Sequence, residues 1–112
     1  MQSTNKEQAR NSVTKNHAVA KLIAGLGRVL SLLHVLELDS VNWPHRVVLV
    51  DLRQLEAQLT DEEQAHLAGE LARALRAMRK IAVLAVPGAM REGGGVRVFD
   101  SDGAACQWLD QP

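Results

Sequence analysis

The clearest pattern in this chain is a series of short apolar segments separated by amphipathic ones. Residues 47–52 (VVLVDL) and 81–86 (IAVLAV) are almost continuously apolar and rich in β-branched side chains. Such runs favour strands that are covered on both faces, as parallel strands are. Val96–Phe99 is a third, shorter strand candidate. Because helical segments alternate with these strands, the pattern predicts an α/β fold: a small, mainly parallel or mixed sheet with helices packed on it.

Residues 61–78 carry the strongest helix signal. Thr60 and Glu63 have the T-x-x-E spacing of a capping box, in which each side chain satisfies a free amide of the first turn. Acidic residues gather at the start of this segment and arginines at its end, which suits the helix dipole. We therefore predict a helix whose buried stripe consists of Leu67, Leu71, Leu75 and Met78. A shorter helix, Asp102–Leu109, is expected near the end of the chain, capped by Asp100 or Ser101.

Residues 17–38 admit two interpretations. Residues 18–25 alternate as a strand does, and residues 29–38 have helical spacing, with Gly25 and Gly27 between them. One continuous helix over residues 17–38 would also present an apolar stripe, but each glycine would weaken it by roughly 1 kcal/mol. A strand followed by a helix is the preferred interpretation, and the single helix stays open as the alternative.

Size and composition narrow the class of protein. At 112 residues, 46% of them hydrophobic, the chain can build one core without disulfides or metal. We expect a disordered polar tail over residues 1–12 and one domain over residues 13–112. The 13 basic and 13 acidic residues balance, and the chain has only three aromatic residues, so a nucleic-acid surface is not expected. One cysteine, a polar start and no bilayer-length apolar run indicate a soluble cytoplasmic protein without a membrane span.

Three segments together resemble the STAS-like superfamily, the fold of bacterial anti-sigma-factor antagonists, and most closely its uncharacterised bacterial branch. They are residues 47–52, residues 81–86 and the ending VRVFDSDGAACQWL over residues 96–109. The resemblance implies a non-catalytic interaction or regulatory module that binds a protein partner or itself. In the latter case it would form a homodimer through an edge strand or a helix face.

One departure from that family concerns its phosphorylation motif. The resemblance implies an Asp-Ser-Ser-Gly motif, with a phosphorylatable Ser or Thr at the start of the helix after the central strand. Here residues 51–63 read DLRQLEAQLTDEE, without Ser or Gly. The capping box already accounts for the presence of a hydroxyl at Thr60. A phosphate on Thr60 would be repelled by the three carboxylates that follow it. We therefore expect no phosphoswitch of the usual kind.

A ligand site is the alternative function, and it would lie beyond the carboxyl ends of the strands, where open α/β sheets bind ligands. Asp51, Arg53, Met90 and Arg91 are the residues expected to line this crevice, for a small apolar or anionic, lipid-like ligand. The competing structural interpretation is that Asp51 caps a turn and Arg53 pairs with a surface carboxylate.

A partner surface is indicated by Arg73 and Arg76, which lie on one face of the predicted helix and could hold an acidic partner. The structural alternative is that they complement the helix dipole, with Glu70 supporting Arg73. No catalytic, metal or cofactor constellation is recognisable in the sequence. Cys106 lies on a short apolar helix and is expected to be a buried structural thiol. We expect neither an enzyme nor a bound cofactor or metal.

Overall fold

The structure is a computed structural model that describes residues 8–13, 17–23, 26–55, 58–86, 88, 90, 92 and 95–111. Its elements follow the chain in the order β1 (Gln8–Val13), β2 (Ala18–Ile23), α1 (Leu26–Ser40), β3 (Val47–Asp51), α2 (Asp61–Ala74), β4 (Lys80–Leu84), β5 (Val96–Phe99) and α3 (Asp102–Leu109).

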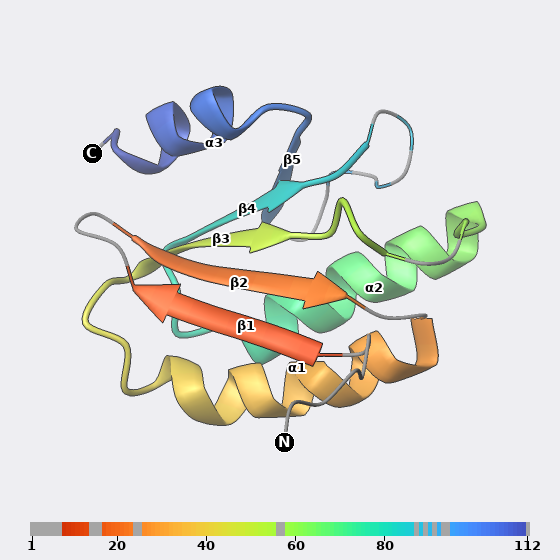
Figure 1. Cartoon of the computed structure of the whole chain (residues 1–112), viewed down its shortest axis with the longest axis horizontal. Coiled ribbons are helices and arrows are strands. Elements are labelled where there is room, and N and C mark those ends of the chain that lie inside the picture. The colour runs from red at the N-terminus through yellow and green to blue at the C-terminus, as the bar shows by residue number, and fades with distance from the viewer. Residues whose placement is uncertain are drawn as a thin grey trace, which may run out of the picture.

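The strands form one mixed sheet in which spatial order equals chain order, β1-β2-β3-β4-β5. Strands β2 to β5 are parallel to their neighbours, and β1 alone among the described strands runs antiparallel, against β2. Helices α1 and α2 cover one face of this sheet, and α3 covers the other (Figure 1). The predicted α/β class, with helices on a mainly parallel or mixed sheet, is confirmed.

The pleat of β3 divides its side chains between the two faces. Val48 and Val50 pack toward α1 and α2, whereas Val47 and Leu49 pack toward α3. All four are buried, because helices cover both faces of this strand. This explains why the segment has no polar alternation in its sequence.

The two interpretations of residues 17–38 are resolved in favour of a strand followed by a helix, and the single long helix is wrong. Strand β2 pairs with β3. Its residues Ala18 and Ala20 are fully buried in the core between the sheet and the helices α1 and α2. Helix α1 begins at Leu26, so Gly27 lies in its first turn rather than in its interior. The pairing of β2 with β3 therefore explains why residues 18–23 form a strand, which the local spacing of apolar residues could not determine.

Residues 8–13 differ from the sequence-based expectation of a disordered tail over residues 1–12. They form β1, with register from Gln8 opposite Ile23 to Val13 opposite Ala18. The first seven residues lie outside the described part of the chain. Main-chain hydrogen bonds pair the strand whatever its side chains are, so a polar strand at a sheet edge leaves no hydrophobic signal.

Helix α2 has the predicted start and an earlier end. The Thr60 hydroxyl accepts a hydrogen bond from the Glu63 amide (3.1 Å), and the Glu63 carboxylate accepts one from the Thr60 amide (2.9 Å). The helix ends at Ala74, and a turn carries the chain on to Met78. The predicted stripe of Leu67, Leu71, Leu75 and Met78 is nevertheless buried throughout. None of the helices in the described residues has the length and apolar character needed to cross a membrane.

Candidate functional site

Asp51 closes β3 at the carboxyl end of the sheet, on the face covered by α3. Its carboxylate accepts three hydrogen bonds from Arg53: from Nε (3.0 Å), from Nη2 (2.9 Å) and from the backbone amide (3.0 Å). Arg53 Nη2 also lies 4.0 Å from the Asp102 carboxylate in the first turn of α3. The pair therefore fixes the turn after β3 and links it to α3.

The charge state of Asp51 follows from two opposing effects. Burial raises the pKa of this carboxyl, since only 6% of the residue is exposed. The hydrogen bonds from Arg53, and attraction to Arg53 and Lys21, outweigh burial and hold the pKa below its ordinary value. Asp51 is therefore ionised at neutral pH. It behaves as a fixed structural anion and is not poised to exchange a proton.

Met90 and Asp51 do not share a crevice. Met90 is only 7% exposed and packs in the core between the sheet and α1 and α2, in the same cluster as Leu52. Asp51 lies on the opposite face, toward α3. Arg91 lies outside the described residues. Of the four predicted crevice residues, the structure thus brings together only Asp51 and Arg53.

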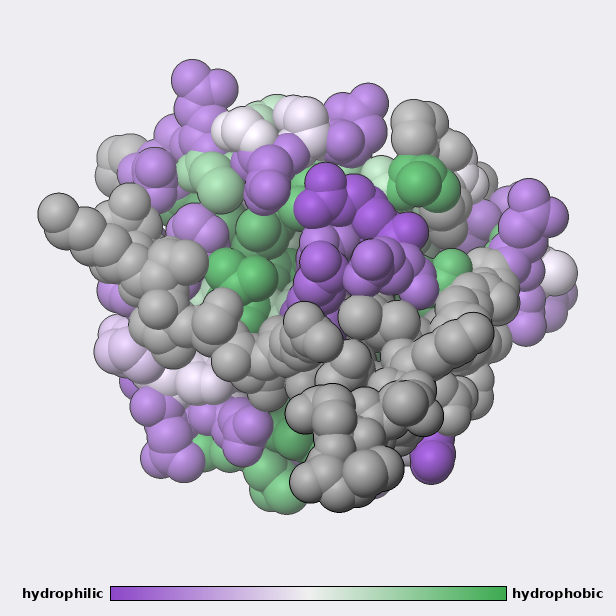
Figure 2. Space-filling view, viewed as in Figure 1, coloured by the Kyte–Doolittle hydropathy of each residue, from purple (hydrophilic) through white to green (hydrophobic). Residues whose placement is uncertain are grey.

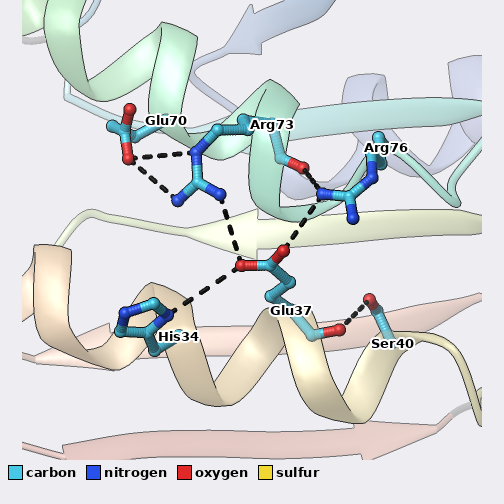
Figure 3. Close-up of polar contacts among 6 residues, drawn as sticks. All are labelled: His34, Glu37, Ser40, Glu70, Arg73 and Arg76. Carbon is cyan, nitrogen blue, oxygen red and sulfur yellow. Dashed lines mark hydrogen bonds and ion pairs between the residues drawn. The ribbon is translucent and has the colours of Figure 1, made fainter.

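Arg73 and Arg76 are held by carboxylates of the same molecule (Figure 3). Arg73 contacts Glu37 of α1 at 3.4 Å and Glu70 at 3.0 Å, and Arg76 contacts the other oxygen of Glu37 at 3.0 Å. His34 lies 3.9 Å from Glu37. The two arginines therefore tie α2 to α1, and an acidic partner would have to displace Glu37 to use both of them.

This network also sets the charge of Glu37. The hydrogen bond from Arg76 is the largest effect and lowers the pKa of Glu37. Desolvation opposes it, and the charges of Arg73 and Arg76 and the hydrogen bond from Arg73 lower the pKa further, so that the net shift is downward. Glu37 is therefore a carboxylate at neutral pH. Sequence reasoning anticipated the Glu70–Arg73 pair but missed Glu37, because its separation from Arg76 along the chain gives no local signal.

Cys106 has a neighbour that the sequence does not indicate. Its Sγ lies 3.8 Å from Nε2 of His17, which immediately precedes β2. Burial, and then the carboxylates of Asp102 and Asp110, raise the pKa of the Cys106 thiol. The thiol therefore stays protonated at neutral pH, and its contact with His17 joins α3 to β2. No group of three His, Cys, Asp or Glu side chains within the described residues is arranged to hold a metal ion.

The outer surface of α1 and the turn that follows it expose apolar side chains that sequence reasoning also missed. Leu38 is 72% exposed and Val41 62% exposed, and Val35 lies one turn before Leu38. Figure 2 shows apolar surface at the lower edge of the molecule, where Figure 1 places α1. The signal was present in the sequence, since α1 carries more apolar positions than one buried stripe requires.

Comparison with known proteins identifies the fold. Neither a family model nor a curated protein matches the sequence. Among solved structures, the chain is similar to the anti-sigma factor antagonist SpoIIAA in its unphosphorylated form. The TM-score is 0.54 at 12% sequence identity, and the match covers 89% of this chain and 94% of that chain. The chain therefore has a STAS-like fold, as the resemblance of its strands and C-terminal segment predicted.

Proposed function

We propose that this chain is a non-catalytic regulatory module of the bacterial STAS-like type that binds a protein partner in the cytoplasm. The observation that carries the proposal is the exposed apolar surface at the end of α1, formed by Val35 and Leu38 of the helix and by Val41 in the turn that follows it. We call it the α1 surface. A fold shared with an anti-sigma factor antagonist supports the same class of function.

The α1 surface has the character of a protein-binding surface. Removing a leucine or valine side chain from water contributes about 2 kcal/mol, so covering Leu38 and Val41 favours association. Exposed polar residues of α1 lie within about one turn of these apolar side chains, namely Ser31, His34 and Asp39. An apolar centre with a polar rim is typical of interfaces between proteins that also exist apart.

We infer that control does not pass through phosphorylation at the start of α2. The segment between β3 and α2 contains no serine, and the Thr60 hydroxyl is engaged in the capping box. A phosphate on Thr60 would stand beside Asp61, Glu62 and Glu63, which repel it. Regulation would then depend on the presence of the partner itself.

A small-molecule binder is the second class of function. Its predicted crevice required Asp51 and Met90 to line one site, and these residues lie on opposite faces of the sheet. The strand-end crevice therefore receives less support than the α1 surface.

The test is to purify the tagged chain from its bacterial host under native conditions, identify bound protein by mass spectrometry, and measure affinity with purified components. The variant Leu38→Glu places a charge in the α1 surface and should weaken binding about tenfold or more. The matched control is Val86→Glu, which changes another exposed apolar residue outside α1 and should leave the affinity unchanged. Light scattering of the purified chain shows whether the partner is a second copy.

Equal affinity of Leu38→Glu and the wild type would refute the α1 surface as the docking site. Mass spectra under native and denaturing conditions address the other class. Extra mass that disappears on denaturation, without any bound protein, would replace the interaction module by a carrier of a small molecule.

A further inference from the structure

The turns that precede β3 and β4 place two arginines side by side at the end of the sheet opposite Asp51. Arg46 immediately precedes β3 and Arg79 immediately precedes β4. The parallel register pairs Val47 with Lys80, and the Arg79 amide donates a hydrogen bond to the Arg46 carbonyl. The main chain thus fixes the two residues as neighbours, and Figure 1 shows both turns on the left of the molecule.

An open hollow of about 590 Å³ lies at these turns. This volume falls within the range of small-molecule sites, about 300–1,000 Å³. Its lining includes Arg46, Arg76 and Arg79, together with His45 and the apolar side chains of Pro44 and Met78. No carboxylate is among the described residues that line it. A second hollow of about 340 Å³ shares His45, Arg46 and Arg79 and adds Asp110.

The arginines of this hollow differ in how their charge is compensated. Arg76 is bound to Glu37 at 3.0 Å. Neither Arg46 nor Arg79 forms an ion pair with a carboxylate within the described residues, and both are exposed. Two like charges at neighbouring positions repel each other, and an anion between them would remove that repulsion.

We propose that this hollow binds a small organic anion, whose phosphate or carboxylate group is held by Arg46 and Arg79. A guanidinium presents paired donors that match either group in a bidentate manner. His45 lies where it can contact the same group, and Pro44 and Met78 provide an apolar wall for the rest of the ligand. The site goes beyond the proposed partner binding and does not depend on it.

The experiment is an NMR titration of the full chain with phenyl phosphate and with benzoate, at an ionic strength kept constant with sodium chloride. We expect saturable shifts confined to the amides around Arg46 and Arg79, and the probe that binds more tightly identifies the anionic group. Arg46→Gln and Arg79→Gln should each weaken that probe about tenfold or more, because each removes charge-assisted hydrogen bonds. The matched control is Arg97→Gln, which removes an exposed arginine on another strand and should leave the affinity unchanged.

Two results would overturn the site. Shifts that do not saturate, or that spread over all exposed basic residues, would show general attraction of anions. A loss of affinity in Arg97→Gln equal to that in Arg46→Gln and Arg79→Gln would also show general attraction of anions. Should a glutamine variant fail to fold, the location of the shifts in the wild-type chain still decides between these outcomes.

Discussion

Asp51 shows how one residue can occupy the position of a ligand site and serve the fold instead. It lies at the carboxyl end of a central parallel strand, where many α/β proteins bind ligands. Here all three hydrogen bonds from Arg53 converge on its carboxylate, and Lys21 faces it across the β2–β3 pairing. A nearly buried anion with this many donors stabilises the folded chain.

Replacing Asp51 by asparagine should lower the free energy of unfolding by roughly 2 kcal/mol at neutral pH, because charge-assisted hydrogen bonds are lost. Since folding lowers the pKa of Asp51, its contribution is fully present above the ordinary carboxyl pKa of about 4. It disappears as pH falls through the lowered value. Urea unfolding across the acid range measures both effects. Asp51→Asn should lose less stability on acidification than the wild type does.

The matched control for this prediction is Glu62→Gln, which removes an exposed carboxylate in the first turn of α2. It should change stability at neutral pH by less than about 0.5 kcal/mol. An unchanged acid slope in Asp51→Asn would mean that the ion pair with Arg53 contributes little to folding.

At the scale of elements, the start of α2 is determined by its capping box, and its other end is held by ion pairs with α1. The reciprocal bonds of Thr60 and Glu63 satisfy two amides that the helix cannot satisfy itself. Near its other end, Arg73 and Arg76 reach Glu37 on α1, so the two helices on this face of the sheet are joined by charge as well as by core packing.

The cap can be tested by replacing Thr60 with alanine, which removes the acceptor for the Glu63 amide. The free energy of unfolding should fall by about 1 kcal/mol, while Thr60→Ser, which retains a hydroxyl, should stay close to the wild type. Denaturant unfolding followed by circular dichroism provides the measurement. If alanine and serine behave alike, the hydrogen bond from the Glu63 amide to the Thr60 hydroxyl contributes little to stability.

Within the described residues, the sheet has covered centre strands, and its outermost strands are paired on one side. Strands β3 and β4 each have a neighbour on both sides and helices on both faces, whereas β1 and β5 have one described neighbour each. An amide in a central strand can exchange with water only when several packed elements open together. An edge strand can separate from the sheet alone.

Hydrogen exchange measured amide by amide should therefore rank the strands. We expect the slowest exchange in β3 and β4, an intermediate rate in β2, and the fastest in β1 and β5. Protection of β1 equal to that of β3 would contradict this order. It would indicate that the outer edge of β1 is covered in solution, for example by a second copy of the chain.

The parts of the fold that could be predicted from sequence are those with local causes. Unbroken apolar runs identified β3 and β4 because helices bury both faces of each strand. The capping box located the start of α2 for the same kind of reason: its partners lie three residues apart.

The parts that could not be predicted depend on contacts between distant segments. Strand β1 is held by main-chain pairing, which its polar sequence does not reveal. The separation of Met90 from Asp51 depends on which face of the sheet the chain covers after β3 and after β4. The contact between Cys106 and His17 joins residues that lie 89 positions apart in the sequence. For the candidate site, the sequence could indicate arginines. It could not indicate which of them form ion pairs with carboxylates of the same chain.

The agreement between strand order and chain order also bears on how the protein forms during its synthesis. Each strand pairs with the strand made just before it, so the sheet can grow at one edge as the chain leaves the ribosome. Pairings between segments close in sequence form quickly, because little chain entropy is lost in bringing them together. Among the described elements, α3 reaches back across the sheet to β3 and to His17. Because α3 follows β3 and β4 along the chain, it docks on strands that are made before it, and that face of the sheet stays exposed until α3 covers it.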